Sequence, residues 1–536
     1  MTTLIRCVDI RIRGLLVRIL LQTMLALAAL PLMTRAAADA KRPNFVFFLT
    51  DDQPYNGMSC TGNAALKTPH MDRLAAEGVL FDRAFVTTAI CCCSRASIFT
   101  GQYMRRHGIE DFKTPLSAAQ WQRTFPALLR DAGYRTAYLG KFAVGQPQVA
   151  GALALPADAF DLWYGFPQSI SFRQVIDGQP HYLTTVMTEK AVEFLKQTKR
   201  DQPFCLIVAF KEPHPPRDYY DPEFKDPVAG RTIPRPPNLT RPSFDALPEI
   251  VRRGLNAIPE WLENPEAFQA EMRSEYALIA RADLAIGRIG QALKDLGLDD
   301  NTVIIQASDN GSIDGAHALE GKWLMYEESI RVPLIIRDLR LPASARGRRQ
   351  QMALNIDLAP TMLSMAGVPV PAGMQGMDLQ PLLRDATAKG REHWYYEHVY
   401  TPDDGRRPIP KSEGVRTERW KYIRYIETSP PLEQLFDLAA DPHEEKDLAR
   451  DPAQAGRLRA LRDLCDGYRK SLRASSQAGS SKPVRLPARR DGKPSQVRTS
   501  ASPFSRMSES ISLRTRSRRA RRILISRPVR FFFTAS

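Results

Sequence analysis

The chain has 536 residues, of which 43% are hydrophobic and 25% charged, and its formal net charge is +16. This length allows one large α/β domain with a smaller partner, each with a buried core. The charge is concentrated at the ends: residues 1–40 carry five Arg against two acidic residues, and residues 474–536 carry 15 Lys and Arg against two. The positive and negative charges of residues 41–473 therefore balance. The basic composition of the whole chain gives no reason to expect that this folded body binds nucleic acid.

The first 40 residues have the pattern of a secretory signal. Several Arg residues precede an apolar run at residues 19–33, and small residues follow it. We expect cleavage near Ala38 or Ala40 and export to the periplasm or the exterior. A membrane anchor is the alternative, but Pro31 and two polar residues interrupt the run and leave it short for a bilayer. No stable membrane insertion is expected after cleavage.

Four apolar runs are predicted as buried parallel strands, because they are nearly continuous rather than alternating. In chain order they span residues 44–49, 136–139, 204–210 and 301–305. Apolar residues at helical spacing predict helices over residues 69–77 and 271–296. This pattern indicates an α/β fold with a large, mostly parallel central sheet that is flanked by helices.

Polar residues follow the predicted strands at the points where they end. They are Asp51, Asp52, Lys141, His214, Asp309 and Asn310. In an open α/β sheet the ligand site lies outside the carboxyl ends of the strands, so these side chains are expected to converge. Dipeptides such as Asp51-Asp52 and Asp309-Asn310 also form caps and Asx turns. Two such pairs after two buried strands favour a shared site.

The character of the sequence changes near residue 385. Residues 414–417 and 420–425 predict short, partly exposed strands of an antiparallel sheet. We therefore expect a catalytic domain over residues 41–385 and a smaller α+β subdomain over 386–473. The basic tail, residues 474–536, is rich in Ser, Arg and Pro and is expected to be disordered.

The seven cysteines do not suggest a disulfide framework. Cys7 falls in the predicted signal, and three of the remaining six are consecutive at residues 91–93. A large domain needs no covalent staples, and a cysteine triplet is better explained by chemistry or by metal binding. The alternative is a buried structural cluster.

Cys91 stands at the start of a predicted helix, and Gly101 is a plausible helix end. A helix N-terminus favours negative charge, which suits a nucleophile that attacks an anionic substrate. Arg95 lies four residues later on the same helical face, within reach of Cys91. If the cluster were only structural, Arg95 would pair with an acid elsewhere.

This segment resembles the signature of the sulfatase family, Cys-x-Pro-Ser-Arg with a following Thr-Gly, in which the first Cys is oxidised to formylglycine. Cys91, Arg95, Thr100 and Gly101 match it, whereas Cys93 replaces the Pro. The resemblance continues through residues 68–74, 133–136, 308–311, 326–333 and 435–442 and covers roughly residues 43–450. It implies a formylglycine-dependent, alkaline-phosphatase-like sulfatase that is similar to carbohydrate sulfatases of the N-acetylglucosamine-6-sulfatase type.

The resemblance also implies one divalent metal ion per chain. Its ligands would be Asp51, Asp52, Asp309, Asn310 and the formylglycine made from Cys91. A shell of carboxylate and amide oxygens suits a hard cation, so we expect Ca²⁺, with Mg²⁺ as the alternative, rather than zinc.

Lys141, His214 and Lys322 match family positions that surround the sulfate and the bridging oxygen, and the resemblance assigns them, with Arg95, to catalysis. His317 is a further candidate, for catalysis or for contact with a sugar. Residue 143 is Ala where the family often has a His after Lys-Trp, so another base, with His214 as the candidate, has to complete the cycle. Asp309 is the candidate base that deprotonates the hydrated formylglycine.

The implied partners are a sulfated carbohydrate substrate and a formylglycine-generating maturation enzyme; no nucleic-acid partner is expected. Two other functions are compatible with the same residues. A phosphodiester or phosphonate monoester hydrolase would share the metal shell, and a catalytically inactive relative would only bind sulfated glycans.

Overall fold

The computed structural model describes residues 41–145, 156–168, 170–217, 227–228, 230–402 and 405–477. The predicted signal, residues 1–40, lies outside the described residues. So does the predicted tail, residues 474–536, apart from residues 474–477, which are helical rather than disordered. The described elements belong to one compact unit that extends to Ser476. The boundary near residue 385 stays a prediction.

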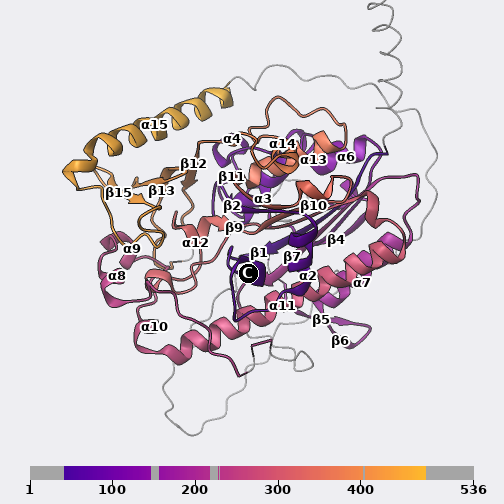
Figure 1. Ribbon diagram of the computed structural model, residues 1–536, viewed down its shortest axis with the longest axis horizontal. Coiled ribbons are helices and arrows are strands. Elements are labelled where there is room, and N and C mark those ends of the chain that lie inside the picture. The colour runs from indigo at the N-terminus through magenta and orange to yellow at the C-terminus, as the bar shows by residue number, and fades with distance from the viewer. Residues whose placement is uncertain are drawn as a thin grey trace, which may run out of the picture. The chain divides into compact units, whose positions relative to one another are not determined.

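A nine-stranded sheet forms the centre of this unit (Figure 1). Its strands are β1 (Asn44–Asp51), β2 (Val79–Phe85), β3 (Arg135–Lys141), β4 (Leu162–Phe166), β7 (Phe204–Pro213), β8 (Thr302–Ser308), β9 (Arg331–Val332), β10 (Leu334–Asp338) and β11 (Gly347–Leu354). The strand order is β11-β2-β10-β8-β1-β7-β3-β4, and β9 pairs with β2.

The four strands predicted from the sequence are confirmed as β1, β3, β7 and β8. β1 is parallel to both β7 and β8, and β7 is parallel to β3, so the four carboxyl ends lie at one edge of the sheet. β10 pairs antiparallel with β8 and with β2, which makes the sheet mixed but mostly parallel.

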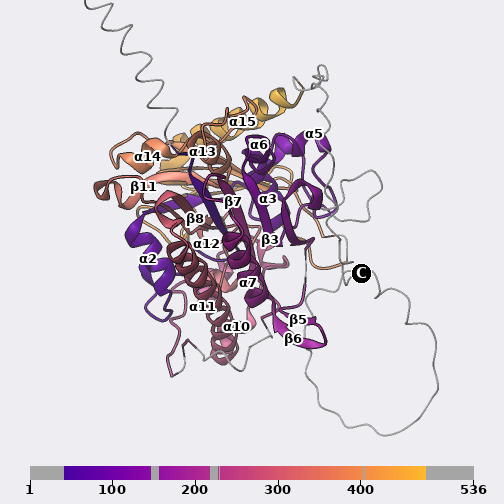
Figure 2. The ribbon, with the colours of Figure 1, turned by 90° about the vertical axis from the view of Figure 1, so that its right-hand side faces the viewer.

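Helices cover both faces of the sheet. They are α2 (Pro69–Glu77), α3 (Cys91–Thr100), α4 (Met104–His107), α5 (Ala118–Trp121), α6 (Phe125–Asp131), α7 (Leu183–Lys196), α8 (Arg241–Asp245), α9 (Glu249–Arg252), α10 (Glu260–Glu263), α11 (Pro265–Asp295), α12 (Glu327–Ile330), α13 (Leu358–Met365), α14 (Gln380–Arg384) and α15 (Ala455–Gln477). Figure 2 shows α2 and α11 on one side of the strands and α3 and α6 on the other.

The two helical layers define two apolar cores. Side chains alternate along β1, so Phe45 and Phe47 join the core with α3, α6 and α13, whereas Val46 and Phe48 join the core with α2, α7 and α11. All eight residues of β1 are buried, which is why its sequence is a continuous apolar run. Among the described helices, none combines the length and the apolar character needed to span a bilayer.

A second, four-stranded antiparallel sheet follows the central sheet in the chain. It contains β12 (His393–His398), β13 (Ser412–Thr417), β14 (Trp420–Tyr425) and β15 (Leu432–Asp437) in that order. The antiparallel pairing is confirmed. The predicted partial exposure is wrong, because β13 and β14 are almost fully buried and share a core with Leu458, Leu461 and Cys465 of α15. A smaller two-stranded hairpin joins β5 (Arg173–Ile176) to β6 (Gln179–Tyr182).

Candidate active site

Cys91 is the first residue of α3, as the sequence predicts. The preceding Ile90 is extended, with φ −151° and ψ 132°, and Gly101 ends the helix in the left-handed region at φ 64°. Cys91 is only 1% exposed. Its Sγ therefore faces the interior at the carboxyl edge of the central sheet, next to the unpaired N–H groups of the first helical turn.

The end of β1 places two carboxylates against this sulfur. Cys91 Sγ lies 3.3 Å from Asp51 Oδ1 and 3.8 Å from Asp52 Oδ1. Asp51 is the last residue of the strand, and Asp52 follows with a positive φ of 67°. This left-handed residue turns the chain sharply, so two consecutive carboxylates face one point instead of opposite sides of the sheet.

Three cations neutralise the carboxylates at this edge. Lys141, at the end of β3, places Nζ 2.5 Å from Asp51 Oδ2. Arg95 Nε donates to Asp309 Oδ2 at 2.7 Å. Because three buried carboxylates meet three buried cations, the cluster is electrically close to neutral.

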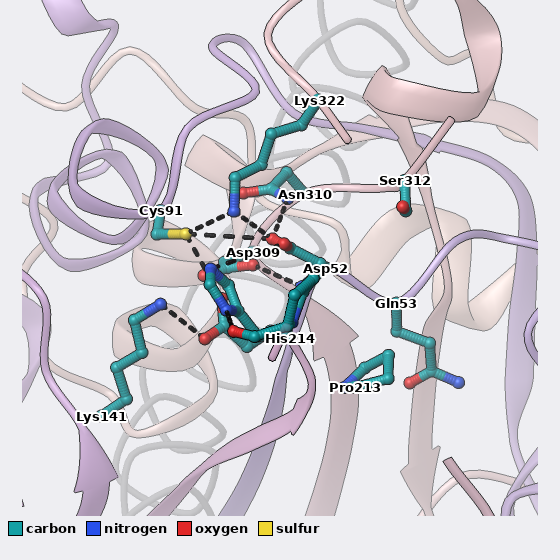
Figure 3. A network of polar contacts seen from close by, with 12 residues as sticks. Asp52, Gln53, Cys91, Lys141, Pro213, His214, Asp309, Asn310, Ser312 and Lys322 are labelled. Atoms are coloured by element: carbon teal, nitrogen blue, oxygen red, sulfur yellow. Dashed lines mark hydrogen bonds and ion pairs between the residues drawn. The ribbon is translucent and has the colours of Figure 1, made fainter. Parts of the chain in front are cut away.

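Lys322 is the third cation and contacts the sulfur directly. Its Nζ lies 2.9 Å from Cys91 Sγ and also donates to Asp52 Oδ1 (Figure 3). Lys322 follows β8 in an irregular loop and not at a strand end, so only the tertiary fold brings it to the cluster.

Burial and charge shift the titration of these groups. Burial alone would raise the pKa of Asp51, but Lys141 and His214 hold it well below its ordinary value. Burial and the neighbouring Asp51 raise the pKa of Asp309 to about 6. Burial, reinforced by Asp51, raises the pKa of the Cys91 thiol well above its ordinary value.

Asn310 provides the test for a metal ion. Its Nδ2 donates to Asp52 Oδ1 at 2.6 Å, whereas its Oδ1 is buried and accepts no hydrogen bond among the described residues. One ligand atom from each of Asp51, Asp52, Cys91 and His214 lies within 4.8 Å of the others. An orphaned amide oxygen beside clustered carboxylates fits a hard divalent cation.

His214 lies at the accessible side of the cluster. It follows β7, and its Nε2 is 3.7 Å from Asp52 Oδ2. Its side chain is 17% exposed, whereas those of Arg95, Lys141 and Lys322 are at most 5% exposed. His214 is therefore the most accessible of these four side chains. Burial, followed by the nearby Lys141 ammonium, lowers the pKa of His214 to about 4.

His317 has a different environment. Its ring packs on Tyr326 with 5.0 Å between ring centroids, and its Nε2 is buried without a hydrogen-bond partner among the described residues. Burial lowers the pKa of His317 to about 4, while Asp441 opposes this shift. These contacts point to the segment that follows β15, not to the Cys91 cluster. Its role stays a prediction.

Two residues that the sequence analysis does not single out support the acid pairs. The Gln53 N–H donates to Ser308 Oγ at 2.9 Å, and Ser308 Oγ donates to the Asn310 carbonyl at 2.8 Å. Both residues are buried. Gln53 directly follows the first acid pair, and Ser308 directly precedes the second. A polar residue next to an acid pair at the end of a buried strand is the sequence feature that could have identified them.

The comparisons with known proteins agree with this geometry. The profile of the sulfatase family matches residues 43–368, more than half of the chain. The chain belongs to the sulfatase family. A second profile, the C-terminal region of N-sulphoglucosamine sulphohydrolase, matches residues 315–470 of this sulfatase and includes its antiparallel sheet. The protein is thus a sulfuric ester hydrolase.

This sulfatase is similar in sequence to two N-acetylglucosamine-6-sulfatases. It is 28% identical to the N-acetylglucosamine-6-O-sulfatase of Bacteroides thetaiotaomicron, over 84% of this chain and 91% of the relative. It is 30% identical to the human N-acetylglucosamine-6-sulfatase, over 66% of each chain.

Two solved structures resemble the sulfatase closely. One holds its substrate D-glucosamine-2-N,6-O-disulfate; it has a TM-score of 0.71 and 26% identity and covers 82% of this chain and all of that one. The phosphonate monoester hydrolase of Agrobacterium radiobacter has a TM-score of 0.66 and 24% identity, over 81% of this chain and 96% of that one, a likeness of fold alone.

Proposed function

We propose that this sulfatase hydrolyses sulfate monoesters of carbohydrates at a site built around residue 91. One observation carries the proposal: Cys91 begins α3 between the Asp51-Asp52 pair and Lys322 Nζ. A helix N-terminus and a buried ammonium group both stabilise an anion at this position. The reaction converts the ester and water into an alcohol and sulfate.

The substrate class follows from the relatives. Two of them are named as sulfatases of N-acetylglucosamine 6-sulfate, and one solved neighbour holds a sulfated glucosamine. We infer that the sulfate esters of amino-sugar units in glycans or their fragments are the substrates. We propose that the sugar lies on the side of His214, because this histidine is more accessible than the three buried cations Arg95, Lys141 and Lys322.

We propose that the divalent cation at this cluster is Ca²⁺. Asp51, Asp52, Asp309 and Asn310 would hold it, and when bound it supplies positive charge next to the sulfate oxygens. Independently of the ion, the pairing of Arg95 with Asp309 keeps that carboxylate fixed at the edge of the sheet. The burial of this cluster excludes bulk water from the reacting group and strengthens each charge interaction.

Formylglycine at residue 91 is the second implied group, and in its hydrated form it would supply the hydroxyl that acts as nucleophile. Lys322 Nζ, which donates to Cys91 Sγ, is the proposed proton donor to the departing alcohol. His214, whose pKa burial lowers to about 4, is neutral near pH 7 and is the proposed base. Lys141 and Arg95 hold Asp51 and Asp309 in place. Ala143 is 1% exposed and carries no titratable group, so it cannot act as the base that the family often has at this position. We propose that His214 takes this role.

A maturation experiment tests the proposal. We propose that the chain is exported and that a formylglycine-generating enzyme oxidises Cys91. The protein is produced with and without such an enzyme, residue 91 is identified by peptide mass spectrometry, and sulfate release from glucosamine 6-sulfate is measured. We expect activity only with formylglycine, and none from Cys91→Ser. Active protein with an unmodified Cys91 would contradict the proposal.

The same protein separates the alternative functions. Phosphonate monoester hydrolysis is compatible with the fold. Matured protein is therefore assayed on the sulfate and the phenylphosphonate ester of 4-nitrophenol, and we expect a higher kcat/KM for the sulfate. Binding of sulfated glycans without release of sulfate would instead support an inactive relative.

A further inference from the structure

The Tyr396 hydroxyl joins the two segments that carry Cys91 and Lys322. The Ala89 N–H donates to Tyr396 Oη at 3.3 Å, and Tyr396 Oη donates to the Trp323 carbonyl at 2.5 Å. The Trp323 N–H donates back to the Ala89 carbonyl at 3.1 Å. These three hydrogen bonds close a ring, two residues before Cys91 and one residue after Lys322.

The ring holds Trp323 in an unusual conformation. Its φ is 79°, in the left-handed region, which costs about 1–3 kcal/mol for a bulky residue and persists only where the surroundings impose it. Both polar groups of the Trp323 backbone are used in the ring, one by Ala89 and one by Tyr396. The direction of the chain at Lys322 therefore depends on these bonds.

Tyr396 belongs to β12 of the antiparallel sheet, and the sheet touches both segments at further points. The Glu397 N–H donates to the Thr87 carbonyl at 3.2 Å. Gly414 lies opposite Tyr396 on β13, and a Cβ on it would approach Met325 Sδ to 2.5 Å. The sheet is thus fitted closely against the loops on either side of the catalytic residues.

We propose that Tyr396 is a positioning residue: through Ala89 and Trp323 it sets Lys322 Nζ against the side chain of residue 91. The inference rests on the proposed function, since Lys322 and residue 91 are its reacting groups. Tyr396 is completely buried, so its hydroxyl acts on substrate only through these two segments. Small displacements of a catalytic group cost large factors in rate.

Tyr395 offers a matched control on the same strand. It is buried as completely as Tyr396, and adjacent strand residues point to opposite faces. The Tyr395 hydroxyl donates to Glu413 Oε2 at 2.7 Å, within the antiparallel sheet. Tyr395→Phe therefore removes the same atom from the same sheet without touching the ring of hydrogen bonds.

The kinetic test compares the two variants after maturation, with formylglycine at residue 91 quantified by mass spectrometry. We expect Tyr396→Phe to lower kcat by about 10- to 100-fold with KM nearly unchanged, because the lost alignment matters mainly in the transition state. Tyr395→Phe keeps its kcat within about twofold of the wild type if only the ring positions Lys322. Equal kcat values for the two variants would overturn the proposal.

A double variant separates positioning from general stability. If Tyr396 acts through Lys322, Tyr396→Phe lowers the residual rate of Lys322→Met by less than about twofold, because coupled sites are not additive. Multiplication of the two effects would overturn the proposed route.

A physical readout does not depend on catalysis. Hydrogen–deuterium exchange should quicken in peptides that span residues 86–93 and 320–326 in Tyr396→Phe and not in Tyr395→Phe. Unchanged exchange in both variants would contradict the proposal. If matured wild type releases no sulfate, the proposed function fails, and the exchange comparison still decides whether Tyr396 holds the two segments.

Discussion

Lys322 Nζ lies 2.9 Å from Cys91 Sγ, although 231 residues separate the two in the chain. The same ammonium group bonds to Asp52. One cation thus contacts both the residue proposed to react and a carboxylate proposed to bind metal. This arrangement keeps the lysine charged and fixed, as a proton donor beside the reacting atom requires.

Loss of this ammonium group should impair catalysis strongly. We expect Lys322→Met to lower kcat by about 10²- to 10⁴-fold, the usual contribution of a positioned proton donor. Steady-state sulfate release by matured protein measures the effect. Lys389→Met is the control, because the Lys389 side chain is 82% exposed and its ion pair with Glu392 lies on the surface. A Lys322→Met variant with near wild-type kcat would remove Lys322 from the proposed site.

Metal removal should weaken the fold as well as the activity. The three carboxylates Asp51, Asp52 and Asp309 meet beside the orphaned Asn310 oxygen, so a bound cation stabilises the folded state only. We expect a chelator to lower the Tm and added Ca²⁺ to restore it more effectively than Mg²⁺. In Asn310→Ala the Ca²⁺-dependent rise in Tm should shrink at equal ion concentration. Equal rises in the variant and the wild type would exclude Asn310 as a ligand.

The hydrogen bond and ion pairs of Arg217, three residues after His214, should be important for stability. Arg217 Nε donates to the Pro213 carbonyl at 3.0 Å, and its guanidinium pairs with Glu271 and with the fully buried Glu275. Arg217→Met strands the Glu275 carboxylate, so we expect a loss of about 3–5 kcal/mol in the free energy of unfolding. Glu271→Gln, at a side chain 38% exposed, should cost less than about 1 kcal/mol. Denaturant titration measures both, and similar losses would contradict this assignment.

A buried carboxylate should make the stability depend on pH. Lys421 Nζ lies 2.8 Å from Glu327 Oε1 and 2.7 Å from Glu444 Oε1. Burial raises the pKa of Glu444 from an ordinary 4.5 to about 7, although Lys421 opposes the shift. Between these values the folded protein keeps a proton that the unfolded chain has lost. The contribution of Glu444 to the free energy of unfolding is therefore complete below pH 4.5 and falls as the pH rises to 7.

The variant Glu444→Gln keeps the shape of the side chain and removes this titration. We expect the wild type to lose about 1–3 kcal/mol more than the variant between pH 5 and pH 8. Denaturant unfolding at the two pH values checks the difference. Parallel pH profiles would show that Glu444 does not carry the effect.

The basic tail should be dispensable for hydrolysis. Residues 474–536 hold most of the net charge, whereas the described site lies wholly within residues 51–322. Removal of residues 478–536 leaves α15 intact. On a substrate whose only charged group is the sulfate ester, kcat and KM of the truncated protein should therefore stay within about twofold of the values for the full chain. Affinity for polyanions such as DNA is the control property that should decrease. A large loss of kcat would give the tail a catalytic role.

The sequence by itself determined which strands form the central sheet and which residues lie at its carboxyl edge. The continuous apolar runs of β1, β3, β7 and β8 indicate strands buried on both faces, and strands of this kind are parallel and end together. This rule alone predicts that Asp51, Lys141 and Asp309, which lie at or just after the ends of these strands, are close together. Cys91 at a helix start and Gly101 at its end are equally local signals.

The tertiary structure decided which loop residues enter the site. Lys322 and His317 both follow β8, His317 in the short 3-10 helix η4 (Ala316–Ala318) and Lys322 in irregular chain, yet Lys322 contacts Cys91 and His317 packs on Tyr326. No periodicity distinguishes them, because loop conformation depends on contacts made elsewhere. The left-handed Trp323 is such a case: Tyr396, 307 residues beyond Ala89, completes its hydrogen bonds. A hydrogen bond between distant segments leaves no pattern in either segment, so only the folded chain reveals it.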